Sequence, residues 1–378
     1  MSNKRKAIGL TFIFLIITCI AFTGCAQKAA EPAQPAAAQV TAAPAAITII
    51  DDVGREISLE KPLERVVVFN KFNSEIIRSL GKVGTIVGTD KNSLQDKEYW
   101  PGWNEGMLAG NSQTDIDYEK VAELKPDAVI LPKNGAYEEC EKKLTPFGIK
   151  VIVITGWENT SFAKQIEIAG KAFAREEKAK EYIGFCQKQV DLLAAALKSV
   201  DGQKTVYLEN SGEYKTCLPG SGWNDMITMA GGRNLFGDVD FANEDQAKGS
   251  VHSFSVDPEE IITRNPSAIL LNVYDSKAIK GTSVYIPPDP DAANEALLAL
   301  TRRPGWKTLG AVKDNSIYGI SAFCGNGCFK IAGATYLAKF LYPEAMAGID
   351  PDVFMTEWLE KYQDMPFQPG HTMAVKVQ

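Results

Sequence analysis

The residues best suited to chemistry in this 378-residue chain are Cys324 and Cys328, in "FCGNGCFK" (323–330). Thiols can bind a metal ion or pair with each other. A structural zinc ion needs about four ligands, and no second Cys or His pair lies nearby in the sequence. A thioredoxin-like redox site has two residues between its cysteines, not three. A disulfide, free thiols in a ligand-contacting wall, and direct ligation of a bound metal all stay open, and we favour the wall.

The compartment of these cysteines follows from the N-terminus. "MSNKRK" is basic, "AIGLTFIFLIITCIAF" is apolar and short for a membrane span, and "FTGC" places Cys25 after small residues. An Ala/Pro/Gln-rich tract without a hydrophobic pattern follows. This order resembles a bacterial lipoprotein signal, in which the peptide is cut before the cysteine and its sulfur is lipidated. We expect a body outside the cytoplasm, anchored to the cell membrane by a lipid on Cys25.

The charge of the chain excludes one class of partner. Its formal net charge is −7, and loss of Lys4, Arg5 and Lys6 with the signal peptide makes the mature chain more negative still. An acidic chain without a basic cluster argues against nucleic-acid binding. No apolar run long enough to span a membrane follows the signal peptide, so the lipid is the expected link to the membrane.

A helix–proline–strand unit occurs twice. "DYEKVAELKPDAVIL" (117–131) and "DPEEIITRNPSAILL" (257–271) align without gaps. Each has an Asp suited to cap a helix, acids in the first turn, a Pro that ends the helix, and a continuously apolar run typical of a parallel strand covered on both faces. The spacing predicts two related α/β lobes. Five further runs read as strands: 65–69, 85–89 and 150–154 in the first lobe, and 204–208 and 316–320 in the second.

A long helix is expected between the lobes. Apolar residues recur with helical spacing from Ala179 to Val200, and no proline interrupts them. The predicted fold is α/β, with two Rossmann-like lobes of parallel sheet joined by one long helix and a ligand cleft between them. The predicted divisions are a signal peptide (1–24), a disordered tether (25–46), an N-lobe (47–174), a linker helix (175–201) and a C-lobe (202–378).

Six motifs in order carry a family resemblance. They are "DDVGREISLEKPLERVVVFN", "YEKVAELKPDAVI", "GKAFAREEKAKEY", "MAGGRNLF", "DPEEIITRNPSAIL" and "YLAKFLYPE". From about residue 47 to 363 the chain resembles the solute-binding lipoproteins of bacterial and archaeal ABC importers for iron complexes and cobalamin. The resemblance implies two α/β lobes with little hinge motion, and delivery of a chelated ligand to a membrane permease and its ATPase. It implies an iron chelate (siderophore or haem) as first choice, with a corrinoid second, and no cofactor beyond that ligand.

An exported α/β enzyme acting on a large cofactor-like substrate is the competing class. No G-x-S-x-G, H-E-x-x-H or phosphate-binding glycine loop stands in a suitable context. The best candidates for a general acid or base, His252 and Asp275, show no partner in the sequence. His371 is the second of two histidines, so a His-rich metal site is not expected. We expect a binding protein and no catalysis.

The cleft should be lined by loops at the carboxyl ends of the strands. Aromatic rings in such loops suit a large ligand with apolar edges, and lysines there could meet an anionic chelate. The predicted cleft residues are Lys71, Phe72, Trp100, Trp103, Lys133, Trp157, Tyr214, Trp223, His252, Tyr274, Cys324 and Cys328; Lys91 and Lys215 are further loop lysines.

One acid in each repeat carries a second expectation. Glu119 and Glu259 each precede the helix-ending Pro by seven residues. The family resemblance implies that such surface glutamates dock on arginines of the permease, one from each lobe. The alternative is that the helix dipole alone favours an acid in the first turn.

Overall fold

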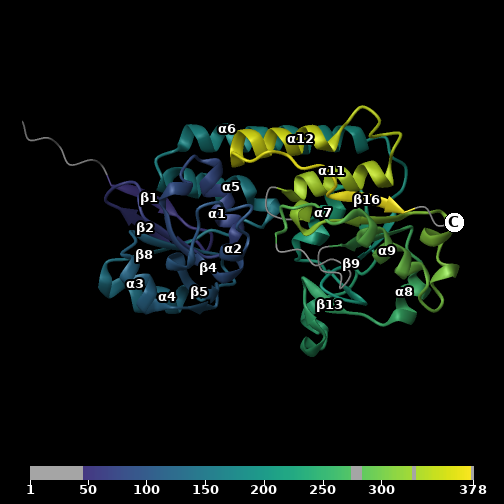
Figure 1. The fold of residues 1–378 in the computed structure, drawn as a ribbon, viewed down its shortest axis with the longest axis horizontal. Helices are drawn as coiled ribbons and strands as arrows, with labels where there is room; N and C mark the ends of the chain where they lie inside the picture. The colour runs from purple at the N-terminus through teal and green to yellow at the C-terminus, as the bar shows by residue number, and fades with distance from the viewer. Residues whose placement is uncertain (1–45, 274–282, 326–328, 376–378) are drawn as a thin grey trace, which may run out of the picture. The chain divides into compact units, whose positions relative to one another are not determined.

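The computed structural model describes residues 46–273, 283–325 and 329–375. The N-lobe (Figure 1) contains a six-stranded sheet. Its strand order is β6-β5-β4-β3-β7-β8, and every neighbouring pair is parallel except β5 and β6. β3 and β7 are buried at every position, as expected for strands covered on both faces. The strands are β3 (Val66–Val68), β4 (Ile86–Asp90), β5 (Leu108–Ser112), β6 (Asp115–Ile116), β7 (Ala128–Leu131) and β8 (Lys150–Val153).

Helices connect these parallel strands, and a hairpin of β1 (Ile47–Ile50) and β2 (Glu56–Leu59) precedes them and contacts α5. The first predicted helix–proline–strand unit is α3 followed by β7. Asp117 caps α3 by accepting a hydrogen bond from the Lys120 N–H at 2.9 Å. The N-lobe helices are α1 (Lys71–Ser79), α2 (Lys91–Gln95), α3 (Tyr118–Leu124), α4 (Tyr137–Leu144) and α5 (Phe162–Ala172).

The C-lobe has a five-stranded sheet of order β11-β9-β14-β15-β16, parallel except for β16, which runs antiparallel to β15. The second repeat unit is α8 followed by β14. The C-lobe also contains a small antiparallel sheet of order β10-β13-β12. The strands are β9 (Thr205–Glu209), β10 (Lys215–Thr216), β11 (Arg233–Asn234), β12 (Gly249–Ser250), β13 (Ser253–Ser255), β14 (Ala268–Asn272), β15 (Ile317–Ile320) and β16 (Thr372–Val375). The helices are α7 (Gly222–Met229), α8 (Pro258–Arg264), α9 (Pro290–Thr301), α10 (Gly310–Lys313), α11 (Phe329–Leu341) and α12 (Pro351–Trp358).

The long helix α6 (Glu176–Leu197) joins the lobes. It contacts α5 of the N-lobe and α7 and α11 of the C-lobe. Its 22 residues correspond to roughly 33 Å of helix. The fold is therefore two parallel-rich α/β lobes joined by one long helix, as the sequence predicted.

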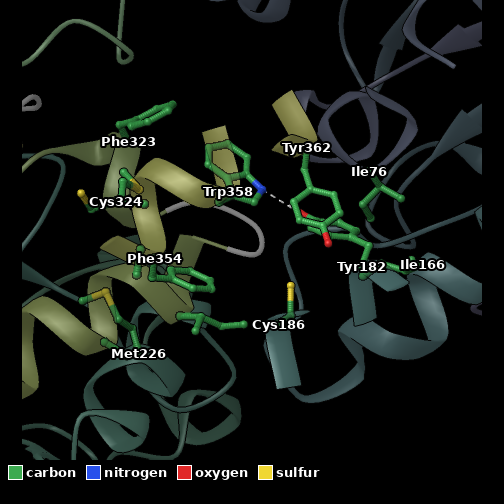
Figure 2. Packing of buried hydrophobic residues seen from close by; sticks show 14 of the residues in the cluster. Ile76, Ile166, Tyr182, Cys186, Met226, Phe323, Cys324, Phe354, Trp358 and Tyr362 are labelled. Atoms are coloured by element: carbon green, nitrogen blue, oxygen red, sulfur yellow. Dashed lines mark hydrogen bonds between the residues drawn. The ribbon is translucent and has the colours of Figure 1, made fainter. Parts of the chain in front are cut away.

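One cluster of buried apolar side chains includes residues of both lobes and of α6. Figure 2 shows the part of it where Tyr182 of α6 meets Trp358 of α12, whose indole N–H donates to the tyrosine hydroxyl at 2.9 Å. Phe185 of α6 stacks on Phe354, with ring centroids 4.8 Å apart. Because rings of α6 and α12 pack in one core together with residues of both lobes, the linker helix is packed against other elements rather than crossing solvent.

The C-terminal segment also contacts the N-lobe. A π-helical turn, Leu359–Gln363, follows α12. The Gln363 side-chain amide donates to Ser79 Oγ at 2.6 Å and to the Glu75 carbonyl at 3.1 Å, and its oxygen accepts from the Tyr99 hydroxyl at 3.1 Å. Among the described residues no helix is long and apolar enough to span a membrane.

Candidate ligand-binding site

A cavity of about 260 Å³ is lined by residues of both lobes. We call it the donor cavity, for reasons given below. The N-lobe residues follow the carboxyl ends of strands, as Asn70 does after β3 and Trp157 after β8, where open α/β sheets present their ligands. The lining residues are Asn70, Phe72, Gln113, Asn134, Trp157, Gly222, Trp223, His252, Gly325 and Lys330.

Three side-chain amides form a chain along the N-lobe wall. Asn70 has a positive φ of 81° and caps α1, its side-chain oxygen accepting from the Phe72 N–H at 3.1 Å. Its amide nitrogen donates to Gln113 Oε1 at 3.1 Å, and Gln113 Nε2 donates to Asn134 Oδ1 at 3.1 Å. Each amide thus uses its oxygen as acceptor, which leaves the N–H₂ of Asn134 as the donor at the end of the chain.

Two tryptophans and the opening glycine loop meet in this cavity. A side chain at Gly325 would lie 2.0 Å from the Trp223 ring, so the ring covers the bare backbone of that residue. Trp157 of the N-lobe packs edge-on against His252, with ring centroids 5.4 Å apart. Glycine in "CGNGC" therefore makes room for Trp223, a role that does not involve the cysteines.

His252 is held in one orientation. Its Nδ1 lies 3.1 Å from Ser221 Oγ, which already accepts a hydrogen bond from the Trp223 N–H at 3.3 Å. A serine hydroxyl can donate one hydrogen bond and accept two, so either neutral tautomer of His252 can make this contact with Ser221. Burial lowers the pKa of His252, and the nearby Lys330 ammonium lowers it further. The imidazole is therefore neutral near pH 7.

Lys330 was not among the predicted site residues, although it is the charged side chain of this wall. It is only 5% exposed, and its ammonium donates to the Trp157 carbonyl across the lobes. A side chain at Gly222 would fall on the Lys330 side chain, so glycine at 222 provides the space that the lysine occupies. In the sequence, Lys330 stands near the start of an apolar helix, and nothing there marks it as a cleft residue.

A second cavity, of about 360 Å³, adjoins the first and shares Asn70, Phe72 and Gln113 with it. We call it the acidic cavity because Asp90 and Asp96 line it. Asp90 caps α2 and accepts hydrogen bonds from the backbone N–H groups of Ser93 and Asn70. Burial raises the pKa of Asp96, which accepts a hydrogen bond from the Ser283 hydroxyl. Lys71 also lines this cavity.

The structure brings together five of the predicted cleft residues in these two cavities: Lys71, Phe72, Trp157, Trp223 and His252. Trp100 is placed elsewhere, contrary to our expectation. It is 1% exposed and lies over the Arg78 guanidinium, 3.6 Å from the ring centroid. Trp103 stacks on Trp100 at 4.3 Å and lines neither cavity.

Three other predicted residues also lie outside the two cavities. Lys133 forms an ion pair with Glu158. Tyr214 packs on the Arg303 guanidinium, 4.5 Å from its ring centroid. Cys324 is a free, fully buried thiol whose pKa is raised by burial, because the loop turns it into the core (Figure 2) and places Gly325 at the cavity instead. The loop lysines Lys91 and Lys215 line neither cavity.

Several predictions fall on residues outside the described ranges: Cys25, Tyr274, Asp275 and Cys328. Glu119 and Glu259 are described, and both are exposed in the first turn of their helices, α3 and α8. Within the described part of the chain, no three His, Cys, Asp or Glu side chains gather as a group that could hold a metal ion.

Two α/β lobes, a connecting helix and a cavity lined from both sides define a solute-binding protein. Residues 66–322 match the periplasmic binding protein family, and the chain belongs to that family. The substrate-binding lipoprotein YvrC of Bacillus subtilis is 24% identical, over 90% of this chain and 98% of its own length. The molybdate-binding protein MolA of Haemophilus influenzae is 22% identical over 85% and 92%.

The fold is also similar to solved structures. The TroA-like periplasmic binding protein FepB from Veillonella parvula superposes with a TM-score of 0.68 and 26% identity, covering 87% of this chain and 100% of its own. The chain is thus a substrate-binding protein of the ABC importer class.

Proposed function

We propose that this protein captures an iron chelate, a siderophore or haem, outside the cytoplasm and delivers it to an ABC permease and its ATPase. The observation that carries the proposal is the donor cavity. Its two tryptophan rings can cover the apolar edge of a chelate, while its amides and His252 contact polar oxygens. The adjoining acidic cavity extends the space available to a ligand larger than a single ion. A corrinoid of the same importer class is the second choice.

The ligand is identified by titration with a panel of compounds. We expect a ferric siderophore or haemin to quench tryptophan fluorescence, because Trp157 and Trp223 line the cavity, and cobalamin and molybdate complete the panel. Trp223→Ala should weaken binding by about 1–3 kcal/mol. Trp100→Phe is the matched control, since it changes a tryptophan that lies in the core and should leave affinity intact. If calorimetry detected no binding of any iron chelate or corrinoid, this ligand class would be wrong.

Binding without turnover is part of the same proposal. Ser221, the hydrogen-bond partner of His252, is buried and caps α7, so it is not placed to act as an exposed nucleophile. We expect the bound chelate to be recovered unchanged after long incubation, as mass spectrometry would determine. A modified product formed at a rate proportional to protein would favour the exported enzyme instead.

The membrane anchor is proposed from the sequence. Cys25→Ala should abolish labelling by a radioactive fatty acid, whereas Cys19→Ala should leave it unchanged. Full labelling of the Cys25 variant would contradict the anchor while leaving ligand capture untouched.

A further inference from the structure

Gln363 connects the two lobes through both polar groups of its side chain. It is 1% exposed and is the last residue of the π-helical turn that follows α12. Its amide nitrogen donates to Ser79 Oγ and to the Glu75 carbonyl of α1, and its amide oxygen accepts from the Tyr99 hydroxyl. All three partners belong to the N-lobe, whereas Gln363 belongs to the C-terminal segment. The side-chain hydrogen bonds of this residue are therefore directed at the other lobe.

Arg78 of α1 adds the backbone of Gln363 to this contact. Arg78 is largely buried, and its guanidinium donates to the Gln363 carbonyl at 3.3 Å and to the Tyr99 carbonyl at 2.7 Å. The guanidinium also lies over the rings of Tyr99 and Trp100. A buried cation is costly to desolvate, and hydrogen bonds to carbonyl oxygens and contact with aromatic faces offset part of that cost. We call Arg78, Tyr99 and Gln363 the interlobe network.

The interlobe network is connected to the acidic cavity through Asp96. The Tyr99 N–H donates to Asp96 Oδ1 at 3.3 Å, and the Ser283 hydroxyl of the C-lobe donates to the same oxygen. Asp96 lines the acidic cavity, and so does Val284, which follows Ser283 in the chain. The next residue, Tyr285, stacks on Tyr99 with ring centroids 5.4 Å apart. This wall of the acidic cavity therefore consists of residues from both lobes, held together beside the network.

Hydrogen bonds and apolar packing constrain the two lobes differently. The aromatic core between α6 and α12 stabilises their contact, but burial of apolar area is non-directional. The interlobe network is directional, because a change in lobe spacing would leave the Gln363 amide and the Arg78 guanidinium buried without their partners. π-helical turns are also rare and occur frequently at functional sites, and this one ends at Gln363. The network is therefore suited to fix one spacing of the lobes.

We infer that Arg78, Tyr99 and Gln363 are positioning residues, which set the spacing of the lobes and thereby keep the two cavities in a shape that is ready for the ligand. The inference rests on the proposed function for the use of that shape. None of the three residues lines either cavity. Their effect on binding is therefore exerted through the fraction of molecules that have the binding-competent spacing.

The test weakens the network and measures the lobe spacing directly. Gln363→Leu replaces the amide by an apolar side chain, and Tyr99→Phe removes one hydroxyl and keeps the ring. Gln165→Leu is the matched control, because Gln165 is also fully buried and makes three side-chain hydrogen bonds, all of them within the N-lobe. Spin labels are introduced with a non-canonical amino acid at Lys142 of α4 and Asn294 of α9, which are exposed. Thermal unfolding establishes that each variant is folded.

Double electron–electron resonance gives the distribution of distances between the two labels in the absence of ligand. We expect a broader distribution for Gln363→Leu than for the wild type, a smaller broadening for Tyr99→Phe, and none for Gln165→Leu.

Gallium(III) complexes of protoporphyrin and of a tris-catecholate are then titrated, because gallium is diamagnetic and leaves the spin labels observable. The complex that the wild type binds should bind Gln363→Leu about threefold to tenfold more weakly. At saturation it should restore the narrow distribution, because it selects the competent spacing. Gln165→Leu should keep the wild-type affinity.

The outcomes that overturn the inference are distinct from a failure of the proposed function. If Gln363→Leu is folded and has the wild-type distance distribution, the network does not set the spacing. If Gln363→Leu and Gln165→Leu broaden the distribution equally, the cause is lost stability and not lost positioning. If Gln363→Leu does not fold, a wild-type distribution for Tyr99→Phe overturns the inference. If neither complex binds, the proposed ligand class fails, and the distances measured without ligand still decide whether the network sets the spacing.

Discussion

The two lobes contain the same local unit, α3–β7 in one and α8–β14 in the other. In each, an aspartate caps the helix, Asp117 or Asp257, and the helix ends at a residue in the left-handed region, Lys125 or Asn265, both with φ of 47°. A proline follows, and then a strand that is buried at every position. The backbone of this unit is therefore repeated closely, down to the conformation of the residue that ends the helix.

What the two lobes do with that unit differs. The N-lobe supplies the donor cavity with an amide chain and one tryptophan, all neutral, whereas the C-lobe supplies Lys330, His252 and the second tryptophan. The sheets also differ on the side beyond the repeated strand: β8, next to β7, ends the N-lobe sheet in parallel, whereas β16 is added antiparallel to β15 in the C-lobe sheet. The repeated unit determines where the loops lie. The loop sequences are not repeated, and they supply the side chains that line the cavity.

The largest expected effect comes from changing the equivalent acids of both lobes. Glu119→Arg with Glu259→Arg should abolish uptake through the cognate permease and leave ligand affinity intact, because each change places like charges together at the proposed docking surface. Each single change should reduce uptake only in part. Glu123→Arg, on the exposed last turn of α3, is the control. Normal uptake by the double variant would leave only a helix-dipole role for these acids.

The next effect contrasts one arginine–carboxylate pair in each lobe. Arg303 makes two hydrogen bonds to Glu209, at 2.6 and 2.8 Å, and both side chains are largely buried. Arg303→Met should lower the free energy of unfolding by about 3–5 kcal/mol, because it leaves a buried carboxylate without its cation. Glu209 Oε2 keeps hydrogen bonds from the Tyr207 hydroxyl and the Tyr214 N–H, but Oε1 loses the one that Arg303 donates.

Arg55→Met in the N-lobe should lower the free energy of unfolding by less, about 1–2 kcal/mol, although Asp51 is also buried. Asp51 keeps hydrogen bonds from the backbone N–H groups of Val53, Arg55 and Val153 when the guanidinium is removed. Urea unfolding measures both values, and equal losses would show that the backbone donors do not compensate.

The free energy of unfolding should depend on pH through the C-lobe, which contains both histidines of the chain. Burial lowers the pKa of His371 from 6.5 to about 4. Between these values the unfolded chain binds a proton that the folded chain does not, so stability is full above pH 6.5 and is lost as the pH falls toward 4. The contribution is about 3 kcal/mol.

The measurement is the free energy of unfolding at pH 7 and at pH 4.5 for the wild type and for His371→Leu. The variant should lose less stability between the two pH values. His252, whose pKa is also lowered, should add a change of the same sign that is present in both proteins. Equal losses in wild type and variant would mean that His371 is not buried as a neutral group.

The smallest expected effect is a difference in stability between changes at the C-terminal ends of α3 and α8. Lys125→Gly should stabilise the protein by about 1 kcal/mol or less, because glycine adopts a positive φ without strain. Asn265→Gly should instead destabilise it by about 0.5–1.5 kcal/mol, since the Asn265 side chain accepts a hydrogen bond from the Gly310 N–H at 2.9 Å. Thermal unfolding of both variants tests the contrast, and effects of the same sign would contradict it.

The parts of the fold that could be predicted are those set by local sequence. Capping aspartates and prolines delimit α3 and α8, apolar runs identify β7 and β14, and helical spacing predicted a linker over 175–201 where α6 occupies Glu176–Leu197. The antiparallel strand β16 was not predicted, because Thr372–Val375 acquires its role only by pairing with β15.

The site was predicted less well, because its residues are selected by distant partners. Trp100 is an aromatic residue in a loop, as a ligand-facing ring would be, but the Arg78 guanidinium covers it. Arg78 in turn donates hydrogen bonds to the Tyr99 and Gln363 carbonyls. Lys330 looks like a solvated lysine at a helix start until the fold brings the Trp157 carbonyl to it from 173 positions away. Loop composition therefore indicates which face binds a ligand but not which side chains line it.

The position of β16 has a consequence for the order in which the molecule is completed. The N-lobe sheet uses residues 66–153 and can form before the rest of the chain is available, whereas the edge of β15 stays unpaired until residues 372–375 arrive. Gln363 reaches α1 only at the same late stage. A chain that emerges from its N-terminus first therefore keeps the β15 edge unpaired until residues 372–375 are available. Truncation there would expose a strand edge open to pairing with other chains, and we expect aggregation to follow.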